Sequence, residues 1–146
     1  MEVREALAAR ISTRAYLDTP VSEAQVRELL RLAGRSPSGG NLQPWQVHVV
    51  SGTARQRVID AVKASQAVHP MGEPELEYQV YPKPIEDPWR ARRFACGEAM
   101  YATLGIPRED KLTRLAQFAR NFGFFDAPVG LFVSLHKSMQ PGQWSD

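Results

Sequence analysis

The chain has 146 residues, of which 43% are hydrophobic and 23% are charged, and its formal net charge is +2. This length fits one domain with a core of its own, and no apolar run approaches the roughly 20 residues of a membrane-spanning helix. One local cluster of arginines lacks interleaved aromatic residues, which argues against nucleic-acid binding. We therefore expect a soluble protein with neither nucleic-acid nor membrane partners.

The start of the chain and its cysteine content indicate the compartment. The first residues lead directly into a polar helix rather than into a signal peptide. Cys96 is the one cysteine, so an intrachain disulfide cannot form. A reducing compartment, the cytoplasm, therefore fits the chain best.

The first third of the chain predicts two helices and a loop. Apolar residues at four-residue steps predict an amphipathic helix over residues 2–11. Ser22 and Gln25 form a capping-box pattern that opens a second helix, and Gly34 ends it. A turn-rich loop follows at residues 35–45.

The middle of the chain predicts a strand, a helix and an irregular segment. Residues 46–50 are rich in β-branched side chains and predict a short buried strand. A helix begins near Thr53. Five prolines then predict a long irregular segment at about residues 69–88, which is either a lid or a poorly ordered excursion.

The second half of the chain completes an α+β or α/β pattern. Helices are expected at residues 89–104 and after Pro107, followed by a buried strand at residues 129–135. The alternation of helices with two well-separated strands indicates this architecture. Because two strands make a poor sheet, we expect a partner chain or a further segment to complete it.

Two segments carry the chemistry. Residues 10–14, Arg-Ile-Ser-Thr-Arg, set two guanidiniums and a hydroxyl two positions apart, which suits a phosphate. Residues 36–45 form a loop whose glycines allow a close approach to a ligand and whose Asn41 and Gln43 both donate and accept hydrogen bonds. A planar heterocycle with a phosphate tail would use both segments. Taken singly, they also fit a solvated helix end and a simple connector.

Other reactive or aromatic residues have simpler interpretations. Cys96 lies in an apolar helical stretch and is expected to be a small core residue. No spacing of His, Cys and carboxylate residues resembles a metal site, so no metal is expected. A group of aromatic residues is expected in the core or at a dimer interface: Phe118, Phe122, Phe124 and Phe125.

Together these segments resemble the FMN-dependent nitroreductase family. The resemblance runs from the first helix to the last residue and rests on residues 10–14, 36–45, 125–128 and 143–146. It implies an α+β nitroreductase-like domain over residues 1–146, with an antiparallel or mixed sheet flanked by helices. It also implies a homodimer with FMN at its interface. Such a dimer would explain why the sheet of one chain lacks strands.

The resemblance also implies flavin contacts at specific positions. These are Arg10, Ile11, Ser12, Arg14, Pro37, Ser38, Gly39, Asn41 and Gln43. Arg10 and Ser12 would hold the phosphate and ribityl end of FMN. Arg14 would lie near the pyrimidine side of the ring, where a cation stabilises reduced flavin, and it is the candidate catalytic residue.

The loop residues have different implied roles. Residues 37–39 would pack along the ring or the ribityl chain, often from the other subunit. Asn41 would hydrogen-bond the ring edge, whereas Gln43 would orient the loop.

The activity implied by the resemblance is hydride transfer from NAD(P)H through FMN to an electron-poor acceptor such as a nitroaromatic or a quinone. Members of the family extend well beyond position 146, so the chain resembles a C-terminally truncated member. Two alternatives stay open at this point: a non-catalytic homodimerising fragment that has lost flavin, and a flavin-fold enzyme with other chemistry.

Overall fold

The computed structural model describes residues 2–69 and 79–146. The chain divides into two compact units, and each is described by itself. The strand unit comprises Met1–Val58 and Phe124–Asp146, and the helical unit comprises Ile59–Gly123. The expectation of a single domain over residues 1–146 stays a prediction.

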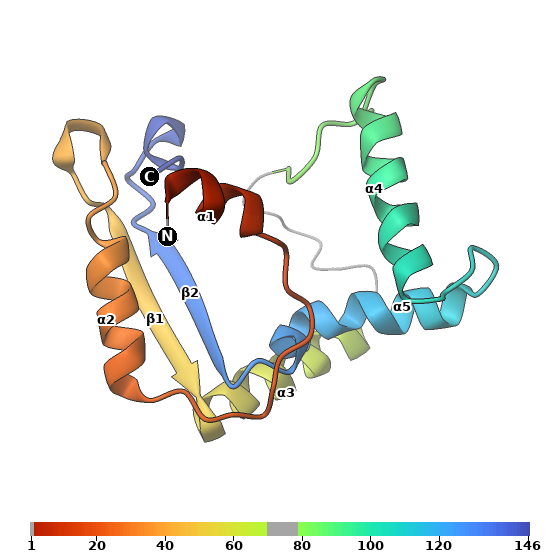
Figure 1. Ribbon diagram of the computed structural model, residues 1–146, viewed down its shortest axis with the longest axis horizontal. Helices are drawn as coiled ribbons and strands as arrows, with labels where there is room; N and C mark the ends of the chain where they lie inside the picture. Colours follow the sequence, from red (N-terminus) through yellow and green to blue (C-terminus); the bar gives the residue numbers. More distant parts are fainter. Residues whose placement is uncertain (1, 70–78) are drawn as a thin grey trace. The chain divides into compact units, whose positions relative to one another are not determined.

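The strand unit is built around a two-stranded antiparallel sheet (Figure 1). β1 (Trp45–Ser51) pairs with β2 (Val129–Leu135) in a register that runs from Trp45 opposite Leu135 to Ser51 opposite Val129. Both predicted strands are confirmed. The other elements of this unit are α1 (Val3–Ala9), α2 (Glu23–Ala33), the 3₁₀ turns η1 (Gly39–Asn41) and η3 (Pro141–Gln143), and the first residues of α3 (Gly52–Val68).

The capping box predicted for α2 is confirmed. The Ser22 hydroxyl accepts from the Gln25 backbone N–H at 3.3 Å, and the Gln25 side chain accepts from the Ser22 backbone N–H at 2.9 Å. These bonds satisfy two backbone groups that a helix start leaves without partners. The helix ends at Gly34, as predicted. The loop at residues 35–44 then connects α2 to β1.

The prediction that both strands are buried is wrong for this chain. One face of the sheet carries the cross-strand pairs Val47–Val133 and Val49–Leu131, which suit a pleated apolar surface. Yet Val49 is 44% exposed and Val133 is 67% exposed. α2 covers only part of this face. The strands therefore have the apolar sequence pattern of buried strands, but their side chains stay partly exposed.

A strained turn leads into β2. Phe124, Phe125 and Asp126 all have left-handed φ values of 56°, 50° and 68°, a region that non-glycine residues rarely adopt. The Phe124 and Phe132 rings pack edge to face, with 5.7 Å between their centroids. A Cβ atom on the buried Gly130 would lie 2.5 Å from the Phe124 ring. The turn therefore requires glycine at position 130.

The helical unit contains most of α3 together with α4 (Trp89–Thr103) and α5 (Lys111–Ala119). Arg114 of α5 donates to both carboxylate oxygens of Glu98 in α4, at 2.6 and 3.0 Å. The same guanidinium donates to the carbonyl of Pro107 and lies over the Tyr101 ring, 4.2 Å from its centroid. One largely buried side chain, 15% exposed, thus joins both helices and their connection.

Two predictions in the helical unit need correction. The helix expected after Pro107 begins at Lys111, because the chain first forms a turn and the Asp110 carboxylate then caps the helix by accepting from the Thr113 N–H. Cys96 is exposed rather than buried. It lies two residues before Glu98 and so faces away from the packed side of α4.

The aromatic group is less buried than expected. Phe118 and Phe122 stack edge to face at 5.8 Å but are 56% and 38% exposed. In the proline-rich segment, residues 79–88 form no helix or strand before α4, which confirms the predicted irregularity there. The rest of that segment, residues 70–78, lies outside the described residues. In the described part of the chain, no helix has the length and apolarity to cross a membrane.

Gly130→Ala should lower the free energy of unfolding by about 1–3 kcal/mol, because the new methyl group overlaps the Phe124 ring. Urea unfolding followed by circular dichroism measures the change. Gly142→Ala is the matched control, since a Cβ atom there meets nothing within 4 Å. Equal stability of the two variants would show that the ring does not lie against Gly130.

Glu98 gives the helical unit a pH-dependent stability. Its hydrogen bonds to Arg114 lower the pKa of the carboxyl group. The folded state therefore binds this proton less readily, so the stabilisation is complete above the unfolded pKa of about 4.3 and is lost as the pH falls below it. Glu98→Gln should lower the thermal midpoint at pH 7, and its difference from wild type should shrink at about pH 3. Glu86→Gln, which changes an exposed carboxylate of the same unit, is the matched control and should keep the thermal midpoint of the wild type at pH 7.

Candidate functional site

The segment at residues 10–14 leaves α1 as extended chain. Arg10 follows the last residue of α1 with φ −66° and ψ 122°, and its N–H still donates to the Ala6 carbonyl at 3.1 Å. The side chains of Arg10 and Ser12 are exposed, and in the described part of the chain neither has a hydrogen-bond or ion-pair partner. Both groups are therefore available to a ligand.

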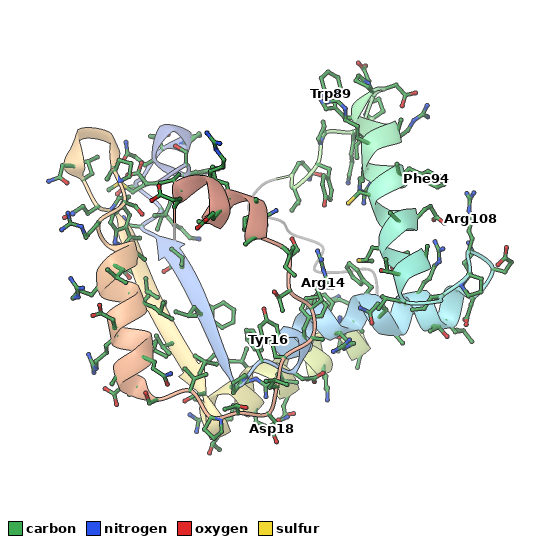
Figure 2. The ribbon with its side chains drawn as sticks, viewed as in Figure 1. Arg14, Tyr16, Asp18, Trp89, Phe94 and Arg108 are labelled. Atoms are coloured by element: carbon green, nitrogen blue, oxygen red, sulfur yellow. The ribbon has the colours of Figure 1, made fainter. Side chains whose placement is uncertain are left out.

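Arg14 is held differently from Arg10. Its guanidinium donates to the Ser12 carbonyl at 3.2 Å and lies 5.9 Å from the centroid of the Phe125 ring. The neighbouring Tyr16 hydroxyl donates to the Thr13 carbonyl at 3.3 Å. Figure 2 labels Arg14 and Tyr16 on this segment. Arg14 is thus fixed to its own backbone and to the turn before β2.

The loop at residues 36–43 has a strained backbone. Gly40, Asn41 and Gln43 have left-handed φ values of 61°, 55° and 50°. Glycine and asparagine tolerate this region better than other residues, whereas glutamine does so at a cost. Such a backbone persists only where neighbouring contacts hold it.

Those contacts come from the end of the chain. The Ser38 hydroxyl donates to Oδ2 of Asp146 and accepts from the Gln43 backbone N–H at 2.9 Å. The Gly39 backbone N–H donates to Oδ1 of Asp146 at 3.3 Å. Nε2 of Gln143 lies 3.2 Å from where a Cβ atom on Gly39 would stand. Asp146 and Gln143 thus close over the loop.

The structure assembles one of the two predicted segments more fully than the other. Ser38 and Gly39 are both bonded to Asp146, and Gln43 is bonded to Ser38. Pro37 and Asn41 belong to the same loop. Within the described ranges, no hydrogen bond or ion pair joins residues 10–14 to residues 36–45. The single site predicted from both segments is therefore not closed by direct contacts within one chain.

Sequence reasoning did not assign Asp146 and Gln143 to the site. A signal was present, because residues 143–146 were among the segments that matched the family. Nothing in that segment indicated its partner, since Ser38 and Asp146 are 108 positions apart. Over residues 2–69 and 79–146, no group of three His, Cys, Asp or Glu side chains is placed to hold a metal ion.

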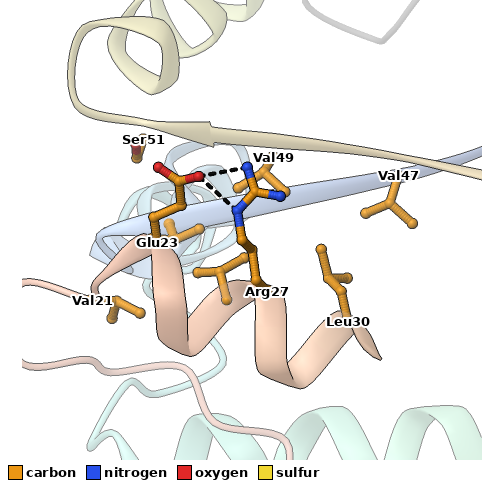
Figure 3. Close-up of a pocket in the computed structure, with 9 residues that line it drawn as sticks. Val21, Glu23, Arg27, Leu30, Val47, Val49 and Ser51 are labelled. Carbon is orange, nitrogen blue, oxygen red and sulfur yellow. Dashed lines mark hydrogen bonds and ion pairs between the residues drawn. The ribbon is translucent and has the colours of Figure 1, made fainter. Parts of the chain in front are cut away.

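A cavity of about 450 Å³ lies between α2 and the sheet (Figure 3). Its walls are mostly apolar: Val21, Val26, Leu30, Val47, Val49 and Val129. An exposed ion pair between Glu23 and Arg27 accompanies them, with 2.5 Å between the charged atoms. The cavity shares no residue with the predicted ligand contacts and lacks convergent donors for a phosphate. It marks where α2 stands off the sheet.

Comparison with known proteins identifies relatives. Residues 7–145 match the sequence model of the Nitroreductase family. The chain is 37% identical over 131 residues to the nitrobenzene nitroreductase of Ectopseudomonas oleovorans, a match that covers 90% of this chain and 57% of that protein. The chain thus spans little more than half the length of this relative.

Solved structures share the fold. The FMN and NADPH-dependent nitroreductase NfnB from Sphigopyxis sp. strain HMH superposes with a TM-score of 0.90 at 49% identity, over 99% of this chain and 65% of that one. The FMN-dependent nitroreductase NfnB from Mycobacterium smegmatis, in complex with NADPH, gives a TM-score of 0.86 at 26% identity, over 97% and 63%. The predicted α+β fold of this type is confirmed.

The backbone of the loop predicts a graded response at Gly40. Gly40→Ala should lower the free energy of unfolding by about 1–2 kcal/mol, because alanine disfavours the left-handed conformation. Gly40→Asn should lower it by roughly half as much, since asparagine adopts that conformation more readily. Urea unfolding measures both variants. Equal losses would mean that the conformation at position 40 is not left-handed.

Proposed function

The chain belongs to the nitroreductase family, and we propose that it acts as an FMN-dependent oxidoreductase that transfers hydride from NAD(P)H to an electron-poor acceptor, such as a nitroaromatic or a quinone. Its relatives support this proposal. One is named a nitrobenzene nitroreductase, and another, at 36% identity, a 4-nitrobenzoate reductase. A related solved structure is described as FMN and NADPH-dependent.

The observation that carries the proposal is the pair of exposed side chains at Arg10 and Ser12. A guanidinium and a hydroxyl two positions apart, each without a partner in the described chain, form a donor set that fits the FMN phosphate. When bound, FMN would supply the ring that accepts and returns hydride, while the protein supplies binding, orientation and electrostatics. The residues present therefore fit this cofactor.

The other residues have distinct roles in this proposal. Arg14, held against Phe125, would direct its positive charge toward the negative charge that develops on a reduced ring. The side-chain amide of Asn41 has no partner in the part of the chain that the structure describes, so it can bind the ring edge. Residues 37–39 would pack along the ring or the ribityl chain.

A homodimer is part of the proposal. Residues 10–14 and 36–45 are not joined within one chain, and a second copy could bring its loop to the first segment of the other. The exposed apolar side chains of the sheet supply a surface for such a contact, with Leu131 47% exposed and Val133 67% exposed. A cytoplasmic location likewise stays a prediction.

Removing the phosphate donors should weaken FMN binding. The double variant Arg10→Ala/Ser12→Ala loses charge-assisted hydrogen bonds, so its Kd for FMN should rise by at least about tenfold. Quenching of FMN fluorescence measures the Kd, and circular dichroism checks the fold. Arg4→Ala, which removes the same charge from α1 outside the motif, should bind FMN like the wild type. Full flavin occupancy in the double variant would contradict the phosphate assignment.

Three measurements beside this titration separate the proposal from its alternatives: the oligomeric state, the reduction of bound flavin by NAD(P)H, and the reduction of an acceptor. The non-catalytic homodimerising protein is indicated if the wild type retains no FMN and its oligomeric state does not change when FMN is added. A yellow protein that NAD(P)H bleaches, but that does not reduce nitroaromatics or quinones, would indicate a flavin-fold enzyme with other chemistry.

A further inference from the structure

The two oxygens of the Asp146 carboxylate serve two adjacent groups of the loop. Oδ2 accepts from the Ser38 hydroxyl and Oδ1 accepts from the Gly39 backbone N–H at 3.3 Å. Ser38 and Asp146 are both half-buried. Hydrogen bonds to an ionised acceptor in such surroundings are stronger than neutral ones, so this carboxylate is well placed to fix the loop.

The single hydrogen-bond donor of the Ser38 hydroxyl is used by this arrangement. The hydroxyl has one hydrogen, which it donates to Asp146, and its oxygen accepts from the Gln43 backbone N–H at 2.9 Å. A ligand therefore meets neither this donor nor the Gly39 N–H in this conformation. The hydroxyl instead spans the loop, from Gln43 at one end to the carboxylate at the other.

The loop needs such support because its backbone is strained. Two non-glycine residues, Asn41 and Gln43, have left-handed φ values. Each strained residue raises the free energy of the loop, so the conformation persists only where surrounding contacts impose it. Among the described residues, the hydrogen bonds that reach this loop from a distant part of the sequence are those of Ser38 and Gly39 to Asp146.

We propose that Asp146 is a positioning residue for cofactor binding: its carboxylate holds Ser38 and Gly39, and through them sets the loop conformation that presents Asn41 to the flavin. The proposal rests on the proposed function of the chain. In this proposal Asp146 acts through Ser38 and Gly39 rather than through a contact of its own with the cofactor. Ser38 then contributes to binding by shaping the loop rather than by donating to the ring.

The test uses Asp146→Asn, Ser38→Ala, their double variant and the control Asp18→Asn, which changes an exposed carboxylate elsewhere in the strand unit. Amide hydrogen exchange in the flavin-free protein is read by NMR. Asp146→Asn should speed exchange at Gly39, and Ser38→Ala should speed exchange at Gln43, each by about tenfold. Exchange within β1 and β2 should not change, which separates positioning of the loop from a general loss of stability.

Titration with FMN supplies the second measurement. Asp146→Asn and Ser38→Ala should each raise the Kd for FMN by about tenfold. Because both substitutions break the same linkage, the Kd of the double variant should stay within about twofold of the higher of the two single-variant values. Asp18→Asn should match the wild type.

The outcomes are distinct. Unchanged exchange at Gly39 in Asp146→Asn would overturn the proposal, and so would a loosened loop that binds FMN with wild-type affinity. Fully additive losses would overturn the shared linkage. A wild-type protein without FMN binding would contradict the proposed function instead, and the exchange rates would then decide the loop linkage on their own.

Discussion

The antiparallel register of β1 and β2 is the constraint on which the rest of the strand unit depends. Because Trp45 lies opposite Leu135, the chain that enters β1 and the chain that leaves β2 meet at the same end of the ladder. This places Ser38 beside Asp146 despite their distance in the sequence. The opposite end of the same ladder receives the strained turn at Phe124. A shift of register would separate the loop from its support and alter the turn as well.

The local elements could be predicted from the sequence because their signals are local. Three sequence patterns each predict their element without reference to the rest of the chain: the Ser22 and Gln25 pair, the β-branched run at residues 46–50 and the apolar run at residues 129–135. The burial of the strands could not be predicted, because an apolar strand has the same sequence pattern whether or not another element covers it. The start of α5 was also misplaced, since Pro107 suits a turn as well as a first helical turn.

The candidate site divides in the same way. Residues 10–14 and 36–45 could be proposed from the sequence because their side-chain types and order are specific. In the described chain the side chains of Arg10 and Ser12 are exposed and have no hydrogen-bond or ion-pair partner, which is compatible with that proposal. The contact between Ser38 and Asp146 could not be predicted, since it depends on strand register rather than on any pattern near either residue. The left-handed backbone at Gln43 also lacked a signal, because glutamine is not a residue that favours it.

The sheet has a further physical consequence. With two strands in the described chain, each strand has one paired edge and one open edge, whose N–H and C=O groups have no strand partner there. Proteins usually protect such edges with charged residues or proline. Neither Trp45–Ser51 nor Val129–Leu135 contains one. In concentrated solution, a strand of another molecule can therefore pair with the open edge of β1 or with the open edge of β2.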